Sequence, residues 1–350
     1  MDCTSVGEGD RLRRVLVAGG AGYIGSHMVK ALRAAGIEPV VLDSLRSGHR
    51  DAVREAELIE GDLGDRALLD EVLSGRSFDA VMHFASFIQV GESVRRPDLY
   101  YRNNVTNTQT LLEAMREHEV GVCVFSSSAA IFGEPEEVPI AEEQPKAPIN
   151  PYGRSKWMVE QMLEDWDRAF GLRSASLRYF NAAGADPDGE LGERHDPETH
   201  LIPLALRVAA GREGSLMVHG DDYDTRDGTC IRDYVHVADL CDAHLLALLR
   251  LWDGAPSGAY NLGNGAGFSV REVIEAARRV TGREIAVTYG PRRAGDPVRL
   301  VADSARARQA LGWQPRRSAL ATIIGDAWRW EASGPPKPVR TDKKGKGRGK

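Results

Sequence analysis

Arg14-Val-Leu-Val-Ala-Gly19-Gly-Ala-Gly22-Tyr-Ile-Gly25-Ser-His27 contains the strongest indication of the fold in this sequence. Residues 14–17 form an apolar run of the length of a buried parallel strand, and a helical pattern of apolar residues follows the turn. Gly19, Gly22 and Gly25 lie in that turn, where the lack of a β-carbon lets backbone N–H groups approach a pyrophosphate at the helix N-terminus. Glycine-rich turns are common, so the position between strand and helix is what makes this one informative.

A second apolar run, residues 39–42, ends on Asp43, 18 residues after Gly25. A carboxylate at the tip of that strand can accept hydrogen bonds from the adenine ribose hydroxyls, and it would repel a 2′-phosphate, which favours NAD over NADP. Arg46 nearby points the other way, and we interpret it as a lid or surface residue. The alternative for Asp43 is that it only caps a loop.

The alternation of strand-length apolar runs with helical patterns continues along the chain. Further short apolar runs end on polar residues, and helical patterns separate them; these runs are residues 57–60, 79–82, 122–125 and 176–179. Strands that alternate with helices indicate an α/β fold with a doubly wound parallel sheet. Ligands of such sheets bind outside the carboxyl ends of the strands, where these polar residues fall. We therefore predict an NAD-binding Rossmann fold with a smaller C-terminal α/β substrate lobe.

Tyr152 and Lys156 are the residues on which we expect catalysis to depend. Their spacing places them on one face of a helix, one turn apart. A phenol ordinarily loses its proton near pH ~10, and a neighbouring cation stabilises the phenolate, which brings tyrosine into range as a general base. Tyr-x-x-x-Lys alone is a weak signal, since any helix can carry it by chance. The nucleotide-binding start of the chain, and a serine run at residues 126–128, give it weight.

The composition bounds the partners of the chain. It has 350 residues, of which 42% are hydrophobic and 27% charged, as in soluble globular proteins. The net charge is −6, but residues 337–350 hold seven Lys or Arg and one Asp, so the rest of the chain carries −12. An acidic body argues against nucleic acid as a partner. The glycine- and lysine-rich tail is expected to be disordered.

The remaining bulk features predict a cytoplasmic protein without a metal site. No apolar run approaches the length of a membrane span, and no secretion signal is evident at the N-terminus. The cysteines lack metal-ligand spacing and are expected to be reduced thiols; they are Cys3, Cys123, Cys230 and Cys241.

Several longer motifs occur in order between residues 14 and 330. Besides the glycine turn they are His-Phe-Ala at 83–85, Val-Gly-Glu-Ser at 90–93, Phe-Ser-Ser-Ser-Ala at 125–129, Pro-Tyr-Gly-Arg-Ser-Lys at 151–156, Leu-Arg-Tyr-Phe-Asn-Ala-Ala-Gly-Ala at 177–185, Ile-Arg-Asp-Tyr-Val-His-Val at 231–237 and Arg-Arg-Ala-Gly-Asp at 292–296. With these motifs, the chain resembles the UDP-glucose 4-epimerases of the extended short-chain dehydrogenase/reductase superfamily. The ordered set is far more specific than a glycine-rich turn.

The resemblance implies which residues bind the ligands. Tyr23 and Ile24 would contact the NAD pyrophosphate, Asp43 the ribose, and Asp62 and Leu63 the adenine. The rest of the cofactor would be lined by Phe84, Ala85, Ser86, Asn103, Lys156 and Phe180. The UDP-sugar would be held by Asn181, His200, Leu201, Met217, Val218, His219, Arg232, Arg293 and Asp296. A diphosphate requires forked cationic donors, which the two arginines provide.

The resemblance also implies a reaction, the inversion of C4 of a UDP-hexose through a 4-keto sugar. Tyr152 would act as the base, Lys156 would lower its pKa and bind the nicotinamide ribose, and Ser128 would hydrogen-bond the reacting oxygen. Related 4,6-dehydratases carry an acid pair beside the serine and decarboxylases a glutamate, whereas Ala129 and Ala130 follow Ser128 here. Elimination of water therefore has no evident proton donor, which favours epimerisation.

The chain departs from the family pattern at several positions. Ile88 stands where many members carry a lysine near the cofactor, and Phe132 where a tyrosine is common. His200 and His219 stand where some members have Asn and Phe. Leu300 occupies the position that the resemblance places beside the sugar 2-substituent, where strict hexose enzymes have a tyrosine. We hypothesise that UDP-N-acetylhexosamines are accepted as well; the alternative is that Leu300 is only a wall residue.

The expected architecture has two lobes between disordered ends. The ranges are 13–180 and 234–262 for the NAD-binding lobe, 181–233 and 263–330 for the UDP-sugar lobe, and 1–12 and 331–350 for the ends. By resemblance, helices over residues 99–118 and 151–170 would pair across a homodimer.

Two alternative functions stay open. One is a 4-epimerase of another UDP-sugar, a uronate or a pentose. The other is a regulator that senses NAD without catalysis, against which the retained Ser128, Tyr152 and Lys156 argue.

Overall fold

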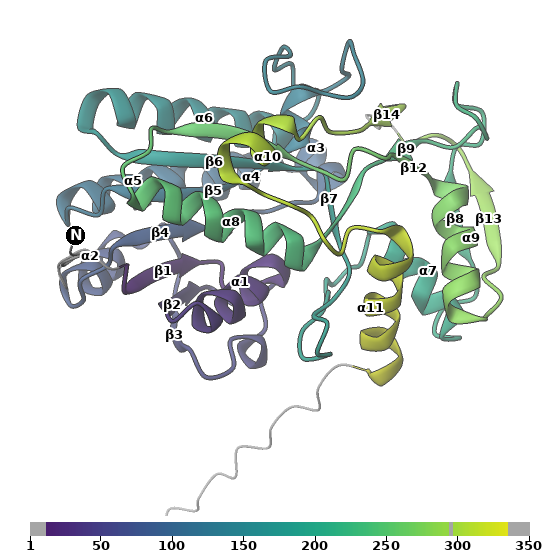
Figure 1. Cartoon of the computed structure of the whole chain (residues 1–350), viewed down its shortest axis with the longest axis horizontal. Coiled ribbons are helices and arrows are strands. Elements are labelled where there is room, and N and C mark those ends of the chain that lie inside the picture. The colour runs from purple at the N-terminus through teal and green to yellow at the C-terminus, as the bar shows by residue number, and fades with distance from the viewer. Residues whose placement is uncertain (1–11, 294–296, 335–350) are drawn as a thin grey trace, which may run out of the picture.

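A seven-stranded parallel sheet forms the first lobe of the computed structural model, which describes residues 12–293 and 297–334 (Figure 1). The strand order is β11-β6-β5-β4-β1-β2-β3. The strands are β1 (Arg14–Ala18), β2 (Glu38–Asp43), β3 (Glu57–Glu60), β4 (Ala80–His83), β5 (Val122–Ser128), β6 (Arg173–Tyr179) and β11 (Gly258–Leu262). The order reverses between β1 and β4, where a ligand crevice opens in such sheets. The predicted doubly wound sheet is confirmed.

Helices cover both faces of this sheet, and β1 shows why. Its residues Val15 and Val17 lie in the core beneath one helical layer, whereas Leu16 and Ala18 lie beneath the other. Alternate residues of a strand point to opposite faces, so a strand buried on both is apolar throughout. The first layer contains α1 (Tyr23–Ala34) and α8 (Val237–Trp252), and the second contains α2 (Arg66–Ser74), α5 (Asn107–Glu117) and α6 (Pro151–Phe170).

The segment that the sequence predicted as one helix over residues 99–118 is divided. The short helix α3 (Val90–Arg95) precedes it, and the segment itself contains the end of α4 (Pro97–Tyr100), a π-helical stretch (Tyr101–Thr106) and then α5. Asn104, in the π-helical stretch, accepts a hydrogen bond from the Phe87 backbone N–H at 2.8 Å and donates to Ser155 Oγ at 3.0 Å. The buried amide thus connects the loop after β4 to α6. Local apolar periodicity gives no sign of this wider turn.

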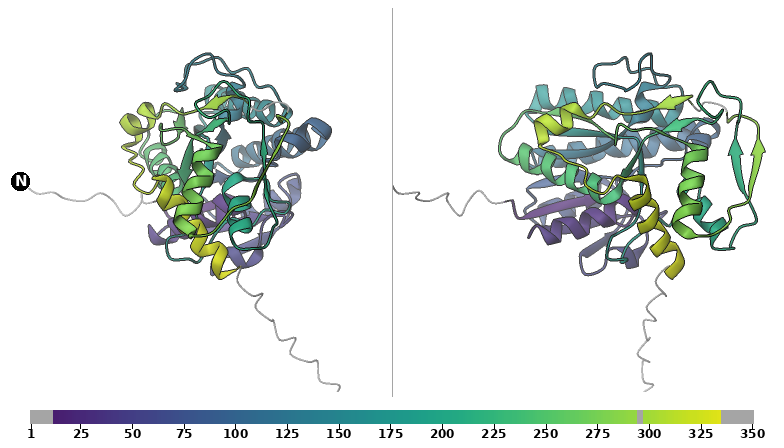
Figure 2. Two further views of the ribbon diagram at one scale, coloured as in Figure 1. Left: turned by 90° about the vertical axis from the view of Figure 1, so that its right-hand side faces the viewer. Right: turned by 45° about the vertical axis from the view of Figure 1, so that its right-hand side comes forward.

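The second lobe is smaller and has its own core (Figure 2). Ile202, Val273 and Ile323 are buried there, one from each of its three main helices. The helices are α7 (Leu201–Ala209), α9 (Val270–Thr281) and α11 (Leu320–Ser333), and a parallel pair of strands, β8 (Leu216–His219) and β13 (Val287–Gly290), packs beside them. Short strands pair nearby as β7 (Asn181–Ala183) with β10 (Tyr234–His236), and as β12 (Phe268–Ser269), β9 (Ile231–Arg232) and β14 (Arg299–Leu300).

The boundary between the lobes differs from the expected one. Residues 263–330 were expected in the second lobe, but α10 (Ala305–Leu311) packs against α8 and β11 of the first. Trp313 is fully buried in the first-lobe core, and its indole N–H donates to the Asp239 carbonyl at 2.8 Å. The chain thus returns to the first lobe at α10 and Trp313. This return depends on contacts between segments far apart in the sequence, which no local pattern reveals.

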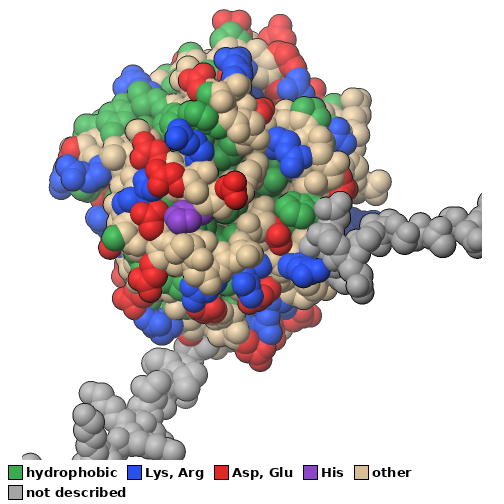
Figure 3. Space-filling model, turned by 90° about the vertical axis from the view of Figure 1, so that its left-hand side faces the viewer, with side chains coloured by type: hydrophobic (Ala, Val, Ile, Leu, Met, Phe, Trp, Pro, Cys, Tyr) green, Lys and Arg blue, Asp and Glu red, His purple; other side chains and the backbone are tan. Residues whose placement is uncertain are grey.

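The ends and the surface complete the description. Leu12 is buried in the first-lobe core and α11 continues to Ser333, so the expected disorder of residues 12 and 331–333 is wrong. Residues 1–11 and 335–350 lie outside the described residues. Within the described parts of the chain, we find no helix whose length and hydropathy would allow it to cross a bilayer. The face in Figure 3 carries acidic and basic side chains interspersed.

Candidate active site

The glycines of the turn after β1 serve two different purposes. Gly19 has a φ of +81°, and a β-carbon there would lie 2.4 Å from the Ala85 backbone nitrogen. A β-carbon at Gly25 would lie 2.2 Å from the Gly19 carbonyl oxygen. At Gly22, just before α1, a β-carbon would meet no described atom nearer than 3.5 Å. Packing therefore requires Gly19 and Gly25, whereas the open side of Gly22 fits a diphosphate at the helix N-terminus.

Asp43 ends β2 beside that turn. One carboxylate oxygen accepts the Ala21 backbone N–H at 2.9 Å and the other accepts the Leu45 N–H at 2.8 Å. Burial raises the pKa of Asp43, although these N–H groups counteract it. The residue does cap its loop, and each oxygen keeps a lone pair for a ribose hydroxyl. The guanidinium of Arg46, an exposed residue, lies 4.4 Å from the centroid of the Phe87 ring.

The other cofactor candidates follow the carboxyl edge of the sheet. Asp62 comes after β3 and accepts the Asn107 side-chain N–H at 2.8 Å, while the buried Leu63 side chain packs in the core. Asn103 donates to the side chain of Asn104 at 2.9 Å. Phe84 comes directly after β4, and its ring centroid lies 4.9 Å from that of His244.

Three further candidates for cofactor binding lie on α1 and at the junction of the two lobes. The Tyr23 hydroxyl donates to the Gly184 carbonyl at 2.7 Å, so this side chain joins the two lobes. Ile24 packs against the first-lobe core. Phe180 packs with Leu300 against a small buried cluster that contains Phe132.

Lys156 is held at the carboxyl ends of β4 and β5. Its ammonium donates to Ser86 Oγ and to the Ser126 carbonyl oxygen, both at 2.7 Å. The side chain is 1% exposed, and burial lowers the pKa of Lys156 to about 7, with the charge of Glu160 acting in the opposite direction. A lysine held in this way is a fixed donor toward the crevice beside β4.

Tyr152 lies in the first turn of α6, close to the end of β5. Asn150 caps this helix by accepting the Gly153 N–H at 2.8 Å, and a β-carbon at Gly153 would lie 2.4 Å from the Ala130 carbonyl oxygen. The helix N-terminus therefore presses against the residues after Ser128. Burial raises the pKa of Tyr152, and its hydrogen bond with Ser128 counteracts this effect. We expected a lowered pKa from Lys156, whose ammonium lies 6.0 Å from the tyrosine ring centroid.

The substrate candidates lie on short elements of the second lobe. Asn181 begins β7 and donates from Nδ2 to the Asp233 carbonyl at 2.9 Å. Arg232 of β9 lies opposite Leu300 of β14. Leu300 also packs against the small buried cluster of Ile131, Phe132 and Ile140, which begins just beyond β5. The structure thus brings the predicted diphosphate arginine and the predicted specificity residue side by side, close to the segment that follows β5.

The remaining candidates are more scattered. His219 ends β8 opposite Gly290 of β13, and Met217 is 48% exposed. The Val218 side chain is buried in the second-lobe core, so only its backbone is available to a ligand. Arg293 is exposed. Asp296 lies outside the described residues, and His200 and Leu201 stand at the start of α7.

Residues 15–263 match the family described as NAD dependent epimerase/dehydratase family. This chain belongs to that family. It is 50% identical to a UDP-glucose 4-epimerase of Halalkalibacterium halodurans over 321 residues, 92% of this chain and 96% of the relative. It is similar to the crystal structure of UDP-glucose 4-epimerase from Brucella ovis in complex with NAD, with a TM-score of 0.88, 52% identity, and coverage of 90% and 97%. The UDP-Glc/GlcNAc 4-epimerase structure from Campylobacter jejuni has a TM-score of 0.80 and 43% identity, over 92% of this chain and 100% of that one.

The sequence did not predict a buried ion pair, Glu160 with Arg178, beside the candidate active site of this family member. The Glu160 carboxylate accepts hydrogen bonds from Arg178 Nε at 3.0 and 3.1 Å and from Nη2 at 2.5 Å. Ser127, next to Ser128, also donates to Glu160. The pair is 5–6% exposed and joins β6 to α6, and Ser127 connects the end of β5 to it. The helical spacing of residues 152, 156 and 160 was a usable signal, but it does not identify Arg178.

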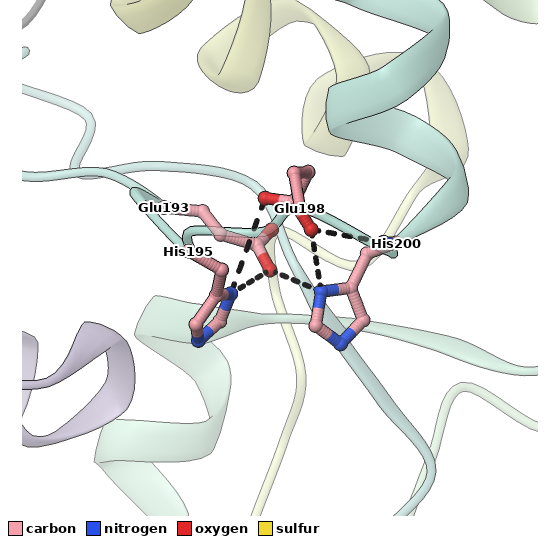
Figure 4. A group of neighbouring side chains, drawn as sticks. All are labelled: Glu193, His195, Glu198 and His200. Atoms are coloured by element: carbon pink, nitrogen blue, oxygen red, sulfur yellow. Dashed lines mark hydrogen bonds and ion pairs between the residues drawn. The ribbon is translucent and has the colours of Figure 1, made fainter. Parts of the chain in front are cut away.

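A cluster of acids and histidines around His200 was also missed. Glu193, His195, Glu198 and His200 point toward one another in the loop before α7 (Figure 4). Burial would lower the pKa of His200, but the charge of Glu193 and bonds to both glutamates raise it well above its ordinary value. The close pattern of these residues between positions 193 and 200 was visible in the sequence, although only cysteine spacing was considered there.

Proposed function

We propose that this chain interconverts UDP-glucose and UDP-galactose by NAD-dependent epimerisation at C4, through a 4-keto sugar. The observation that carries the proposal is the convergence of Ser128, Tyr152 and Lys156 at the carboxyl end of β5. High identity to UDP-glucose 4-epimerases over most of the chain supports the same reaction. The comparisons do not favour the alternative of a uronate or pentose epimerase, nor that of a regulator without catalysis.

NAD fits the residues of the first lobe. Gly22 leaves space at the α1 N-terminus, Asp43 presents a buried carboxylate, and Lys156 is fixed beside Ser86. When bound, NAD supplies the acceptor and donor of the C4 hydride and, in its oxidised form, a positive charge. Lys156 would bind the nicotinamide ribose, and Asp62 would lie toward the adenine.

Proton transfer falls to Tyr152 and Ser128. Tyr152 would remove the proton of the sugar 4-hydroxyl and later return it. Ser128 lies beside the phenol and counteracts the effect of burial on the pKa of Tyr152, so its hydroxyl can pass the proton or stabilise charge on the reacting oxygen. Lys156 would favour the phenolate by its charge, against the effect of burial. Because Ala129 and Ala130 follow Ser128, elimination has no evident acid, and the keto sugar is expected to be reduced.

The UDP moiety would stay anchored while the keto sugar turns. Arg232 and Arg293 would hold the diphosphate with forked donors. Contacts from the rest of the second lobe would come from Asn181, His200, Leu201, Met217, Val218, His219 and Asp296. Retention of UDP keeps the intermediate from escaping between the two hydride transfers.

The substrate range extends to UDP-N-acetylhexosamines in this proposal. Leu300 lies opposite Arg232 and is smaller than the tyrosine of strict hexose enzymes. The similar Campylobacter jejuni protein is described as a UDP-Glc/GlcNAc 4-epimerase. Normal turnover of UDP-galactose without turnover of UDP-N-acetylglucosamine would contradict this part of the proposal.

We also propose a cytoplasmic homodimer. The α6 side chains of Met158 and Phe170 are 41% and 50% exposed, and the nearby Val94 is 62% exposed, which fits pairing of these helices with a second copy. The buried thiols of Cys123, Cys230 and Cys241 form no disulfide with one another, as in proteins of reducing compartments. Sedimentation of the purified chain measures the assembly.

The first test is incubation of purified protein with UDP-galactose, without added NAD, followed by detection of UDP-glucose. Turnover is expected, since the cofactor is regenerated in every cycle and should stay bound through purification. Activity only on UDP-glucuronate or UDP-xylose would change the substrate and keep the mechanism. Inactivity on every UDP-sugar, even with NAD, would overturn the proposal.

A further inference from the structure

The cluster of Glu193, His195, Glu198 and His200 lies outside the catalytic residues, in the connection between β7 and α7. This part of the connection has neither helix nor strand. One donor atom of each side chain lies within 4.8 Å of the others. Figure 4 shows the two rings and the two carboxylates directed toward a common centre.

Hydrogen bonds do not account for all of these contacts. His200 Nδ1 lies 2.8 Å from a Glu193 oxygen and 2.8 Å from a Glu198 oxygen. His195 Nδ1 lies 2.9 Å from the same Glu193 oxygen. An imidazole nitrogen carries at most one hydrogen, so the two contacts of His200 Nδ1 must share it. A cation at the centre would instead meet every one of these atoms as an electron-pair donor.

Glu198 gives a second and independent indication. Its side chain is 0% exposed. Oε1 accepts the backbone N–H groups of Thr199 at 2.7 Å and His200 at 2.9 Å. Oε2 is also buried, has no hydrogen-bond partner among the described residues, and lies 4.0 Å from His195 Nδ1. A buried carboxylate oxygen without a donor is unfavourable, and buried charges are normally paired or bound to a metal.

We propose that these four residues bind one divalent transition-metal cation of the zinc class. Two imidazole nitrogens and two carboxylate oxygens provide four donor atoms, which suits tetrahedral coordination. Two carboxylates balance the charge of a dication when both imidazoles are neutral, as ligation requires. The nitrogen donors disfavour Ca²⁺ and Mg²⁺, which prefer oxygen ligands.

The ion would fix the loop that connects the two lobes. Arg194, within the same loop, forms a two-pronged ion pair with Asp51 of the first lobe, each contact at 2.9 Å. The ring of Tyr23 lies edge-on to His195 at a centroid distance of 6.2 Å. His200 is at once a ligand here and a UDP-sugar contact in the proposed function, on which this positioning role rests. The metal site itself does not depend on that function.

The test uses the full-length chain without an affinity tag, stripped with a chelator and then titrated with Zn²⁺. Mass spectrometry of the dialysed protein measures bound zinc, and a competing chromogenic chelator measures affinity. We expect about one zinc per chain. Loss of a group that only hydrogen-bonds to a metal ligand weakens metal binding by about 10–100-fold. Glu198→Gln and His195→Gln remove ligands themselves, so each should weaken zinc binding by at least this factor. His118→Gln is the matched control and should bind zinc as the wild type does, since it removes a histidine that follows α5 and pairs with Asp70 of α2 at 3.0 Å.

Cobalt gives a readout that ion pairing alone cannot produce. The wild type loaded with Co²⁺ should show the visible absorption of tetrahedral cobalt, and Glu198→Gln should lose it while circular dichroism shows a folded chain. Absence of stoichiometric zinc in the wild type would overturn the proposal, as would equal binding by the wild type and both ligand variants. Neither measurement requires catalysis, so failure of the metal site and failure of the epimerase assignment can be told apart.

Discussion

The two lobes support their proposed site residues in different ways. Tyr152 and Lys156 stand in the first two turns of a 20-residue helix, and Ser128 ends a seven-residue central strand. Arg232 and Leu300, in contrast, stand on two-residue strands. Long packed elements fix the position of a side chain more closely than short ones do. In the proposed mechanism, catalysis therefore depends on the sheet lobe, while substrate choice depends on short segments that tolerate change.

The largest effect should come from removing one hydroxyl in the sheet lobe. Tyr152→Phe keeps the ring but removes the proposed base, so kcat with UDP-galactose should fall by about 10²–10⁴-fold. Tyr289→Phe is the control, because Tyr289 lies on β13 of the second lobe and is 49% exposed. A decrease below tenfold in Tyr152→Phe would show that another group is the base.

The next effect is a loss of stability when the buried ion pair of the sheet lobe is broken. Glu160→Gln leaves the buried Arg178 without its carboxylate and should lower the free energy of unfolding by about 3–5 kcal/mol. Glu164→Gln, one turn further along α6, breaks only an exposed pair with Arg168 and should lower it by less than about 1 kcal/mol. Denaturant titration compares the two, and equal losses would show that the buried pair is no more important than the exposed one.

The pH dependence of stability tests the burial of Lys156. Its pKa is lowered from 10.5 to about 7 on folding, so between these values the unfolded chain holds a proton that the folded chain has released. Stability should therefore rise with pH above about 7, by about 2 kcal/mol between pH 7 and 9. Lys156→Met should lack this part of the rise. Parallel pH curves for the two proteins, measured without added nucleotide, would contradict the lowered pKa.

The smallest effect should come from the second lobe. Leu300→Tyr adds bulk beside Arg232, so kcat/KM for UDP-N-acetylgalactosamine should fall by about tenfold relative to UDP-galactose. Steady-state kinetics with both substrates give this ratio. An unchanged ratio would mean that Leu300 is a wall residue distant from the sugar 2-substituent.

The features that the sequence predicted well are those set by short spacings. Gly19 and Gly25 are required where the backbone turns back on itself, and Tyr152 and Lys156 share a helical face. The apolar runs became the strands of the parallel sheet. Features that were missed join distant segments, such as Arg178 with Glu160, or Trp313 with the first-lobe core.

The prediction that the pKa of Tyr152 is lowered was wrong for a different reason. The sequence places a cation one helical turn away, and that part is correct. Burial raises the pKa nevertheless, because desolvation depends on everything that packs around the phenol. Spacing along a helix gives the neighbours of a group and says nothing of its exposure.

The α/β sheet, the glycine turn for NAD and the family could all be predicted from the sequence, which also supplied the proposed catalytic residues. These follow from local periodicity and from backbone sterics, which act over a few residues. The packed structure was needed to show that α10 belongs to the first lobe, that Glu160 pairs with Arg178, and that two glutamates and two histidines converge before α7. Burial and the convergence of charges depend on segments distant in the chain, and their energies exist only once those segments are packed together.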